Sequence, residues 1–139
     1  MARVSMSVDL DANAENVWEM IGRFNALPDW HPAVEKSEIE GQGKGSVRTL
    51  HLVGGGTIRE KLEQLDEEGK VYSYSILSSP LPVMNYNSTL RLEKNDKGGC
   101  TVHWESDFQP SGAPETDAIK AIQGVYQAGF DNLRKMFGG

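Results

Sequence analysis

The stretch that decides the fold is residues 100–137, CTVHWESDFQPSGAPETDAIKAIQGVYQAGFDNLRKMF. Up to Gln109 its apolar and polar residues alternate, and a period of two predicts a β-strand with one buried face. From about Pro114 to Phe137 the apolar residues recur at helical spacing instead, which predicts a long amphipathic helix with proline in its first turn.

The chain from Val34 to Pro110 predicts further strands joined by short turns. Glycine-rich or polar turns stand at 41–45, 54–56, 67–70 and 95–99. Between them we expect strands at 46–53, 57–66, 71–79, 84–94 and 100–109. Turn signals at such short intervals are typical of an antiparallel meander.

The chain begins with one more strand, in which apolar residues alternate with polar ones from Val4 to Leu10. Asp11 and Asn13 then offer N-cap side chains for a helix, whose apolar stripe is Val17, Trp18, Ile21 and Phe24. Prolines at 28 and 32 break up the segment that follows, so we expect a short helical turn and a loop there. The whole pattern predicts an α+β fold that forms one domain over residues 1–139.

Composition excludes several classes of function. The 139 residues carry a net charge of −6 with scattered basic residues, which argues against a nucleic-acid partner. No apolar run is long enough to insert into a membrane, and the first residues lack the apolar block of a signal peptide, so a cytoplasmic location is the default expectation. The single Cys100 excludes an internal disulfide and a multi-thiolate metal site.

Two charged residues fall on the predicted inner face of the sheet. Arg48 shares a strand face with Leu50, and Glu60 shares one with Leu62. The glycine turn between the two strands sets Arg48 and Glu60 roughly opposite each other. Because desolvating a charge costs several kcal/mol unless it is paired, we consider two interpretations. The pair is either a structural ion pair or a set of polar groups that orients a ligand in a cavity.

The order of elements and a set of local motifs resemble a known family. The motifs are Val17-Trp18, Trp30-His31-Pro32, GSVR at 45–48, EKLEQLD at 60–66 and NYNS at 85–88. They resemble the helix-grip fold of the START or Bet v 1-like (SRPBCC) superfamily, in its polyketide cyclase/dehydrase and lipid-transport branch, and are similar to the plant abscisic-acid receptors. The resemblance implies a curved antiparallel sheet of about seven strands, with two short helices after the first strand, wrapped round the C-terminal helix.

The resemblance also implies a ligand cavity between sheet and helix, framed by a gate loop at 54–56 and a latch loop at 80–83. The implied ligand-binding residues are His31, Arg48, Leu50, Leu52, Glu60, Tyr74, Ile76, Leu81, Val83, Tyr86, Ser88, Glu105, Val125 and Gly129. His31 replaces the receptors' carboxylate-binding lysine, which argues against a hormone receptor and an acidic ligand. For the last strand, simple burial places Trp104 inside, whereas the resemblance places Glu105 inside.

Gly124 and Gly129 lie inside the predicted terminal helix. Each glycine costs about 1 kcal/mol there relative to alanine. A glycine inside a helix predicts a large group packed closely against it.

Three candidate acid–base residues stand out. His31 is one, because the ordinary pKa of histidine suits proton transfer at neutral pH. On a proline-flanked loop, however, its ring can equally form hydrogen bonds with the backbone. Glu60 and Glu105 could form a carboxylate pair in which the pKa of one is raised. The positive charge of Arg48 would oppose that rise, and the three residues would then form a structural network instead. The histidines lie far apart in the sequence, so we expect neither a metal nor a cofactor.

These observations favour binding or transport of a small hydrophobic molecule by a monomer or homodimer. The first alternative is a polyketide cyclase or dehydratase-like enzyme that uses His31 or a cavity glutamate as acid or base. The second is an interaction module whose binding to a protein partner is modulated by a ligand.

Overall fold

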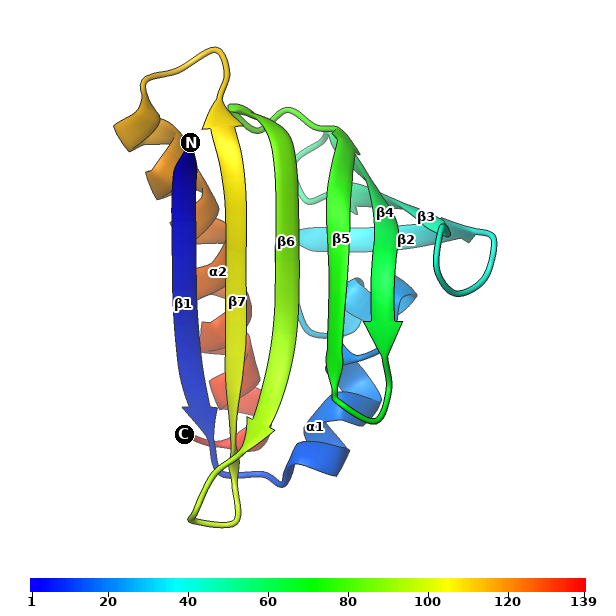
Figure 1. Cartoon of the computed structure of the whole chain (residues 1–139), viewed down its shortest axis with the longest axis vertical. Coiled ribbons are helices and arrows are strands. Elements are labelled where there is room, and N and C mark those ends of the chain that lie inside the picture. Colours follow the sequence, from blue (N-terminus) through cyan, green and yellow to red (C-terminus); the bar gives the residue numbers. More distant parts are fainter.

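The elements follow one another in the predicted order in the computed structural model, which describes residues 1–139 (Figure 1). They are β1 (Ala2–Leu10), α1 (Ala14–Ile21), the 3-10 helix η1 (Phe24–Asp29), β2 (Val34–Glu40), β3 (Val47–Leu52), β4 (Thr57–Asp66), β5 (Val71–Ser78), β6 (Val83–Lys94), β7 (Cys100–Pro110) and α2 (Glu115–Phe137). No helix combines the length and apolarity needed to cross a membrane.

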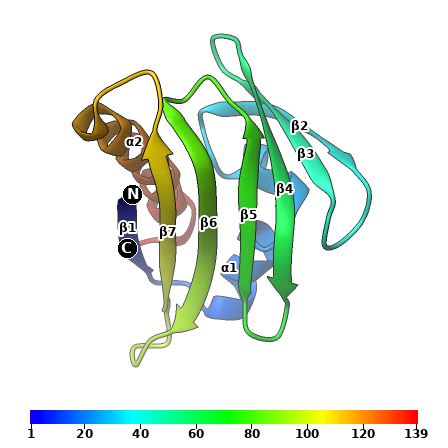
Figure 2. The same cartoon turned by 45° about the horizontal axis from the view of Figure 1, so that its top comes forward.

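The seven strands form one antiparallel sheet in the order β1-β7-β6-β5-β4-β3-β2. Figure 1 shows all the helices on one face of this sheet, with α2 lying along β1 and β7. The sheet curves so strongly that β2 and β3 run across the direction of β6 and β7, as Figure 2 shows. The prediction of a curved sheet around a C-terminal helix is therefore confirmed.

The first helix is shorter than its apolar stripe suggested. The Asn13 side chain accepts a hydrogen bond from the backbone N–H of Asn16 at 2.9 Å, which caps the helix as predicted. Arg23 then adopts an extended backbone, so α1 ends at Ile21. The expectation that Phe24 belongs to this helix was wrong, because Phe24 begins η1. Both elements still bury their apolar side chains under the sheet.

A bulge in β6 changes which residues face the core. The register with β7 shifts between Met84 and Asn87, and Asn85 between them has a φ of 52°. Met84 was expected to face inward but is 48% exposed, because the extra residue reverses the alternation at this point. From Tyr86 onward the predicted inward face is confirmed, since Ser88 and the leucines that follow it are buried.

Candidate functional site

A cavity of about 200 Å³ lies between the concave face of the sheet and α2. Its wall is mostly apolar, with side chains from β3, β4 and β5 on one side and Ile122 and Val125 of α2 on the other. Nine of the predicted ligand-binding residues line it: His31, Leu50, Leu52, Glu60, Tyr74, Ile76, Leu81, Tyr86 and Val125. The structure thus brings together residues from segments far apart in the sequence.

Other wall residues were not predicted as site residues. They are Leu27, Ala33, Val34, Val53, Ile58, Trp104 and Ile122, and the wall also includes Gly55, which was predicted only as part of the gate loop. Ile58 and Ile122 belong to apolar stripes visible in the sequence. The pattern therefore predicts that their side chains are buried, but not that they line a cavity. Whether any wall residue binds a ligand stays a prediction.

Two loops stand at one end of the cavity. Val53 and Gly55 reach it from the turn after β3, and Leu81 reaches it from the segment before β6. A Cβ atom added to Gly56 would lie 3.8 Å from Cγ of Pro80, so the two loops approach each other closely. Gly55 has a φ of 106°, a conformation that side chains disfavour. The turn therefore needs glycine, and the segments implied as gate and latch do meet.

Arg48 and Glu60 form an ion pair beneath the cavity. They are paired across β3 and β4. Arg48 Nε donates to Glu60 Oε1 at 2.8 Å, and Nη2 lies 2.7 Å from the same oxygen. Arg48 Nη1 donates to the carbonyl oxygen of Phe24, and its guanidinium lies 3.9 Å from the centre of the Phe24 ring. The predicted pairing is confirmed. Glu60 lines the cavity, whereas Arg48 lies behind it.

Burial acts on both charges of this pair. Desolvation raises the pKa of Glu60, and the Arg48 charge opposes that rise. Desolvation alone would lower the pKa of Arg48, but the neighbouring groups, with Glu60 first among them, together outweigh it and raise this pKa above its ordinary value. Each partner therefore compensates the other, and the pair adds no net charge to the cavity.

A line of buried hydroxyl groups forms a second polar feature. Tyr74 receives a hydrogen bond from Trp104 Nε1 at 3.1 Å and lies 3.3 Å from the Tyr86 hydroxyl. The Tyr86 and Tyr126 oxygens are 2.5 Å apart, and Tyr126 lies 3.0 Å from Ser88 Oγ. Burial raises the pKa of Tyr126 to about 12 and holds the pKa values of Tyr74 and Tyr86 well above 10.0. All three phenols are neutral at physiological pH.

The contacts of His31 match a structural role. Its Nε2 lies 2.7 Å from the Val125 carbonyl oxygen, and its Nδ1 accepts from the Ala33 N–H at 3.2 Å. The carbonyl oxygen can only accept, so Nε2 carries the proton. Burial lowers the pKa of His31 from its ordinary value. With both nitrogens bonded to backbone and the neutral form favoured, the geometry does not support an acid–base role.

Glu105 is a correction to the predicted site. It lies on the outer face of β7, where its carboxylate is 3.2 Å from Nη2 of Arg3, while Trp104 is buried. The prediction from burial, with Trp104 inside, is therefore confirmed, and the inward placement of Glu105 implied by the resemblance was wrong. Because Glu60 and Glu105 lie on opposite faces of the sheet, the predicted carboxylate pair does not form.

The remaining predicted residues lie outside the cavity wall. Ser88 is buried against Tyr126, and Val83 packs at the edge of the core. Gly129 lies behind His31, since a Cβ atom there would be 3.0 Å from its Cδ2 atom. The expectation of a large group against Gly129 is confirmed. The same expectation was wrong for Gly124, which has no atom within 4 Å of such a Cβ.

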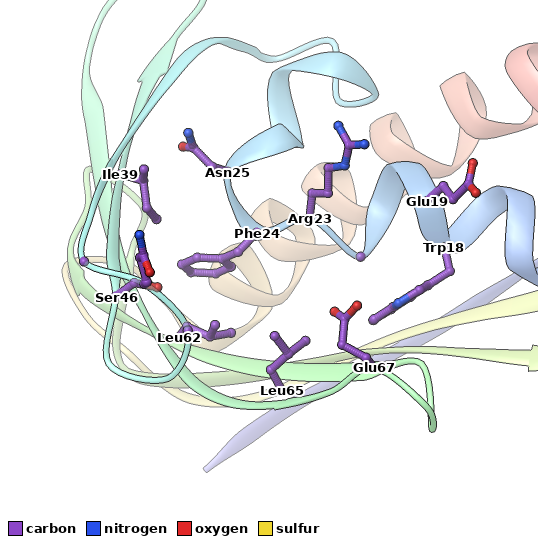
Figure 3. A pocket seen from close by; sticks show the side chains of 14 residues that line it. Trp18, Glu19, Arg23, Phe24, Asn25, Ile39, Ser46, Leu62, Leu65 and Glu67 are labelled. Carbon is purple, nitrogen blue, oxygen red and sulfur yellow. The ribbon is translucent and has the colours of Figure 1, made fainter.

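A second hollow, of about 500 Å³, lies on the surface between α1, η1 and the ends of β2–β4. Figure 3 shows the side chains of Phe24, Leu62 and Leu65 pointing into it, with Glu19, Arg23 and Glu67 around them. Phe24 and Leu62 are themselves part of the buried core. This groove contains no enclosed set of converging polar groups, so the internal cavity is the better candidate site.

A curved antiparallel sheet that closes on a long terminal helix, with a cavity between them, defines the helix-grip class of protein. The chain belongs to the family described as polyketide cyclase / dehydrase and lipid transport, whose model matches residues 1–138.

The chain is similar to solved bacterial structures over nearly its whole length. The protein XoxI from Bacillus cereus is 35% identical with a TM-score of 0.94, over 99% of this chain and 96% of that one. A protein from Bacillus thuringiensis is 34% identical with a TM-score of 0.93, over 98% of each chain. At these identities the likeness extends beyond the fold to the sequence.

The chain is also similar, at lower identity, to plant proteins. The abscisic acid receptor PYL6 of Arabidopsis thaliana is 27% identical over 129 residues, which is 88% of this chain and 55% of the receptor. The Dau c 1 isoallergen Dau c 1.0401 of Daucus carota subsp. sativus is 30% identical over 95 residues, which is 62% of this chain and 61% of the allergen. The chain therefore spans less than two thirds of the length of these relatives.

Proposed function

We propose that this protein binds a small hydrophobic molecule in the cavity between the sheet and α2, as a carrier or sensor. The observation that supports the proposal is an apolar cavity of about 200 Å³ with Glu60 in its wall. A dry apolar cavity of about 150 Å³ is known to take up benzene, so this one suits a ligand of one or two rings. Burial of apolar surface, at about 25 cal/mol per Å², would supply the affinity.

The family description and the relatives support the same proposal. The description includes lipid transport, and the Arabidopsis relative is a receptor for abscisic acid. The contacts of His31 with backbone and of Glu60 with Arg48 favour binding over acid–base catalysis. The alternative of a cyclase or dehydratase therefore has less support than the binding function.

Two neighbouring residues of β5 allow a matched test. Ile76 lines the cavity, whereas Leu77 is 49% exposed on the other face of the strand. Ile76→Phe adds volume inside the cavity, and Leu77→Phe adds about the same volume in solvent. We expect Ile76→Phe to weaken binding of 2-methylnaphthalene at least tenfold, and Leu77→Phe to leave it unchanged. Methyl NMR titration of ligand-free protein measures both dissociation constants.

Native mass spectrometry of freshly purified protein is the companion measurement, because it reports a co-purified small molecule directly. Protein that is shown to be empty, and that then fails to bind 2-methylnaphthalene at all, would contradict the proposal. Equal weakening by both phenylalanine variants would place the binding outside the cavity.

A further inference from the structure

The hydroxyl groups near the cavity have fixed directions of hydrogen bonding. Ser88 Oγ lies 2.9 Å from the carbonyl oxygen of Glu105, and a carbonyl can only accept, so the one Ser88 proton points there. Tyr126 lies 3.0 Å from the same Oγ. Since Ser88 has no second proton to offer, the Tyr126 hydroxyl is the donor in that contact.

The same reasoning continues along the line toward the cavity. The Tyr126 proton is committed to Ser88, so Tyr86 must donate across the 2.5 Å contact to Tyr126. Tyr74 then donates to Tyr86 across 3.3 Å and accepts from Trp104 Nε1 at 3.1 Å. Every hydroxyl in this line donates once, in one direction, ending at the β7 backbone. Tyr74 and Tyr86 therefore reach the cavity wall with no free proton.

The other polar side chains of the wall have no free donor either. The Nε2 proton of His31 is bonded to the Val125 carbonyl oxygen, and its Nδ1 is an occupied acceptor. Arg48 lies behind the wall, with contacts from Nε and Nη2 to Glu60 and from Nη1 to Phe24. The cavity consequently presents its ligand with hydrogen-bond acceptors and with no side-chain donor.

The strongest of these acceptors is Glu60. Both of its contacts with Arg48 use Oε1, and its side chain is 6% exposed. No protein group is found donating a hydrogen bond to Oε2, and because Glu60 lines the cavity, this oxygen is open to a donor from a ligand. A neutral ligand donor would supply that missing partner. A ligand anion would instead lie unpaired, because Arg48 and Glu60 already neutralise each other.

We infer that the cavity is selective for a neutral, mainly apolar ligand that carries one hydroxyl or N–H donor, and that it discriminates against carboxylates and ketones. This inference rests on the proposed binding function and names the ligand class. The acceptor oxygens of Glu60, Tyr74 and Tyr86 select the donor, and the apolar wall holds the rest of the ligand.

Four probes of similar shape test the selectivity: 2-naphthol, 2-methylnaphthalene, 2-acetylnaphthalene and 2-naphthoate. At pH 7 we expect 2-naphthol to bind about tenfold to a hundredfold tighter than its isostere 2-methylnaphthalene. The ketone should bind no tighter than the hydrocarbon, and 2-naphthoate about a hundredfold weaker than 2-naphthol. Titration calorimetry or methyl NMR gives each dissociation constant.

The outcomes separate the inference from the proposed function. Binding of 2-methylnaphthalene with no gain for 2-naphthol, or binding of 2-naphthoate as tight as that of 2-naphthol, overturns the inference while the binding function stands. Failure of all four probes to bind ligand-free protein overturns both.

The direction of the hydroxyl line has its own test. Tyr126→Phe removes the acceptor for the Tyr86 proton, which frees one O–H, on Tyr86 or on Tyr74, to face the cavity. We expect the preference for 2-naphthol over 2-acetylnaphthalene to shrink about tenfold. Ser75→Ala is the control, because its hydroxyl donates to Glu63 and has no contact with this line, and it should leave the preference as in wild type. An unchanged preference in folded Tyr126→Phe overturns the assigned direction.

Discussion

The two glycines of α2 allow one energetic prediction to be worked in detail. In Gly129→Ala the new Cβ would lie 3.0 Å from His31 Cδ2, 3.0 Å from Trp30 Cζ3 and 3.1 Å from Trp104 Cζ3. All three are ring atoms of buried side chains, so none is the flexible end of a chain that swings away. Overpacking of this kind costs about 1–3 kcal/mol.

The substitution also has a favourable part, because alanine stabilises a helix interior by about 1 kcal/mol relative to glycine. Gly124→Ala is the matched control on the same helix, since its Cβ would meet nothing within 4 Å. We therefore expect Gly124→Ala to raise the free energy of unfolding by about 1 kcal/mol. We expect Gly129→Ala to change it by between about zero and −2 kcal/mol.

Urea unfolding followed by tryptophan fluorescence measures both variants. The difference between them isolates the overpacking cost and should be about 1–3 kcal/mol. If Gly129→Ala stabilised the protein as much as Gly124→Ala, the close packing of His31 and Trp104 against α2 would be refuted.

Two further predictions concern the buried charges and the buried histidine. Arg48→Met alone should lower the free energy of unfolding by about 3–5 kcal/mol, because it leaves Glu60 unpaired, and adding Glu60→Leu should recover most of that loss in the same urea assay. Burial lowers the pKa of His31, so below about pH 6.5 the unfolded chain binds the proton more readily and the free energy of unfolding should fall as the pH drops. His31→Gln should flatten that decrease when unfolding is measured between pH 7 and 5, and the slope that remains would belong to groups such as His103, whose pKa burial also lowers.

Each of these two predictions would be contradicted by a different result. A double variant of Arg48 and Glu60 that is no more stable than Arg48→Met would show that the lost stability does not come from an unpaired charge. A wild-type pH dependence that His31→Gln leaves unaltered would show that His31 does not titrate differently in the folded and unfolded states.

The β3–β4 hairpin could be predicted because its register follows from local chemistry. Three successive glycines have positive φ values and mark the turn, so counting back along each strand sets Arg48 opposite Glu60. Burial of both charges then requires that they pair. The terminal helix was predictable for a similar reason, since its apolar stripe persists over many turns.

The errors arose where a local feature competes with periodicity. Met84 has the apolar side chain of a core position, but the bulge that turns it outward depends on the left-handed backbone of Asn85, which alternation alone does not reveal. Glu105 was placed by analogy, whereas its neighbour Trp104 gains more from burial and Arg3 on β1 offers Glu105 an outward partner. The cavity itself depends on the distance between sheet and helix, which no residue pattern specifies.

The measurement that tests the central claim most directly is an isotope-filtered NOE spectrum of 2-methylnaphthalene with the methyl-labelled protein. We predict NOEs from the bound probe to methyl groups of Leu50 on β3, Ile76 on β5 and Val125 on α2, since these line the cavity from both sides. NOEs confined to exposed methyl groups such as those of Leu65 or Leu77, with none to this set, would contradict an internal binding site.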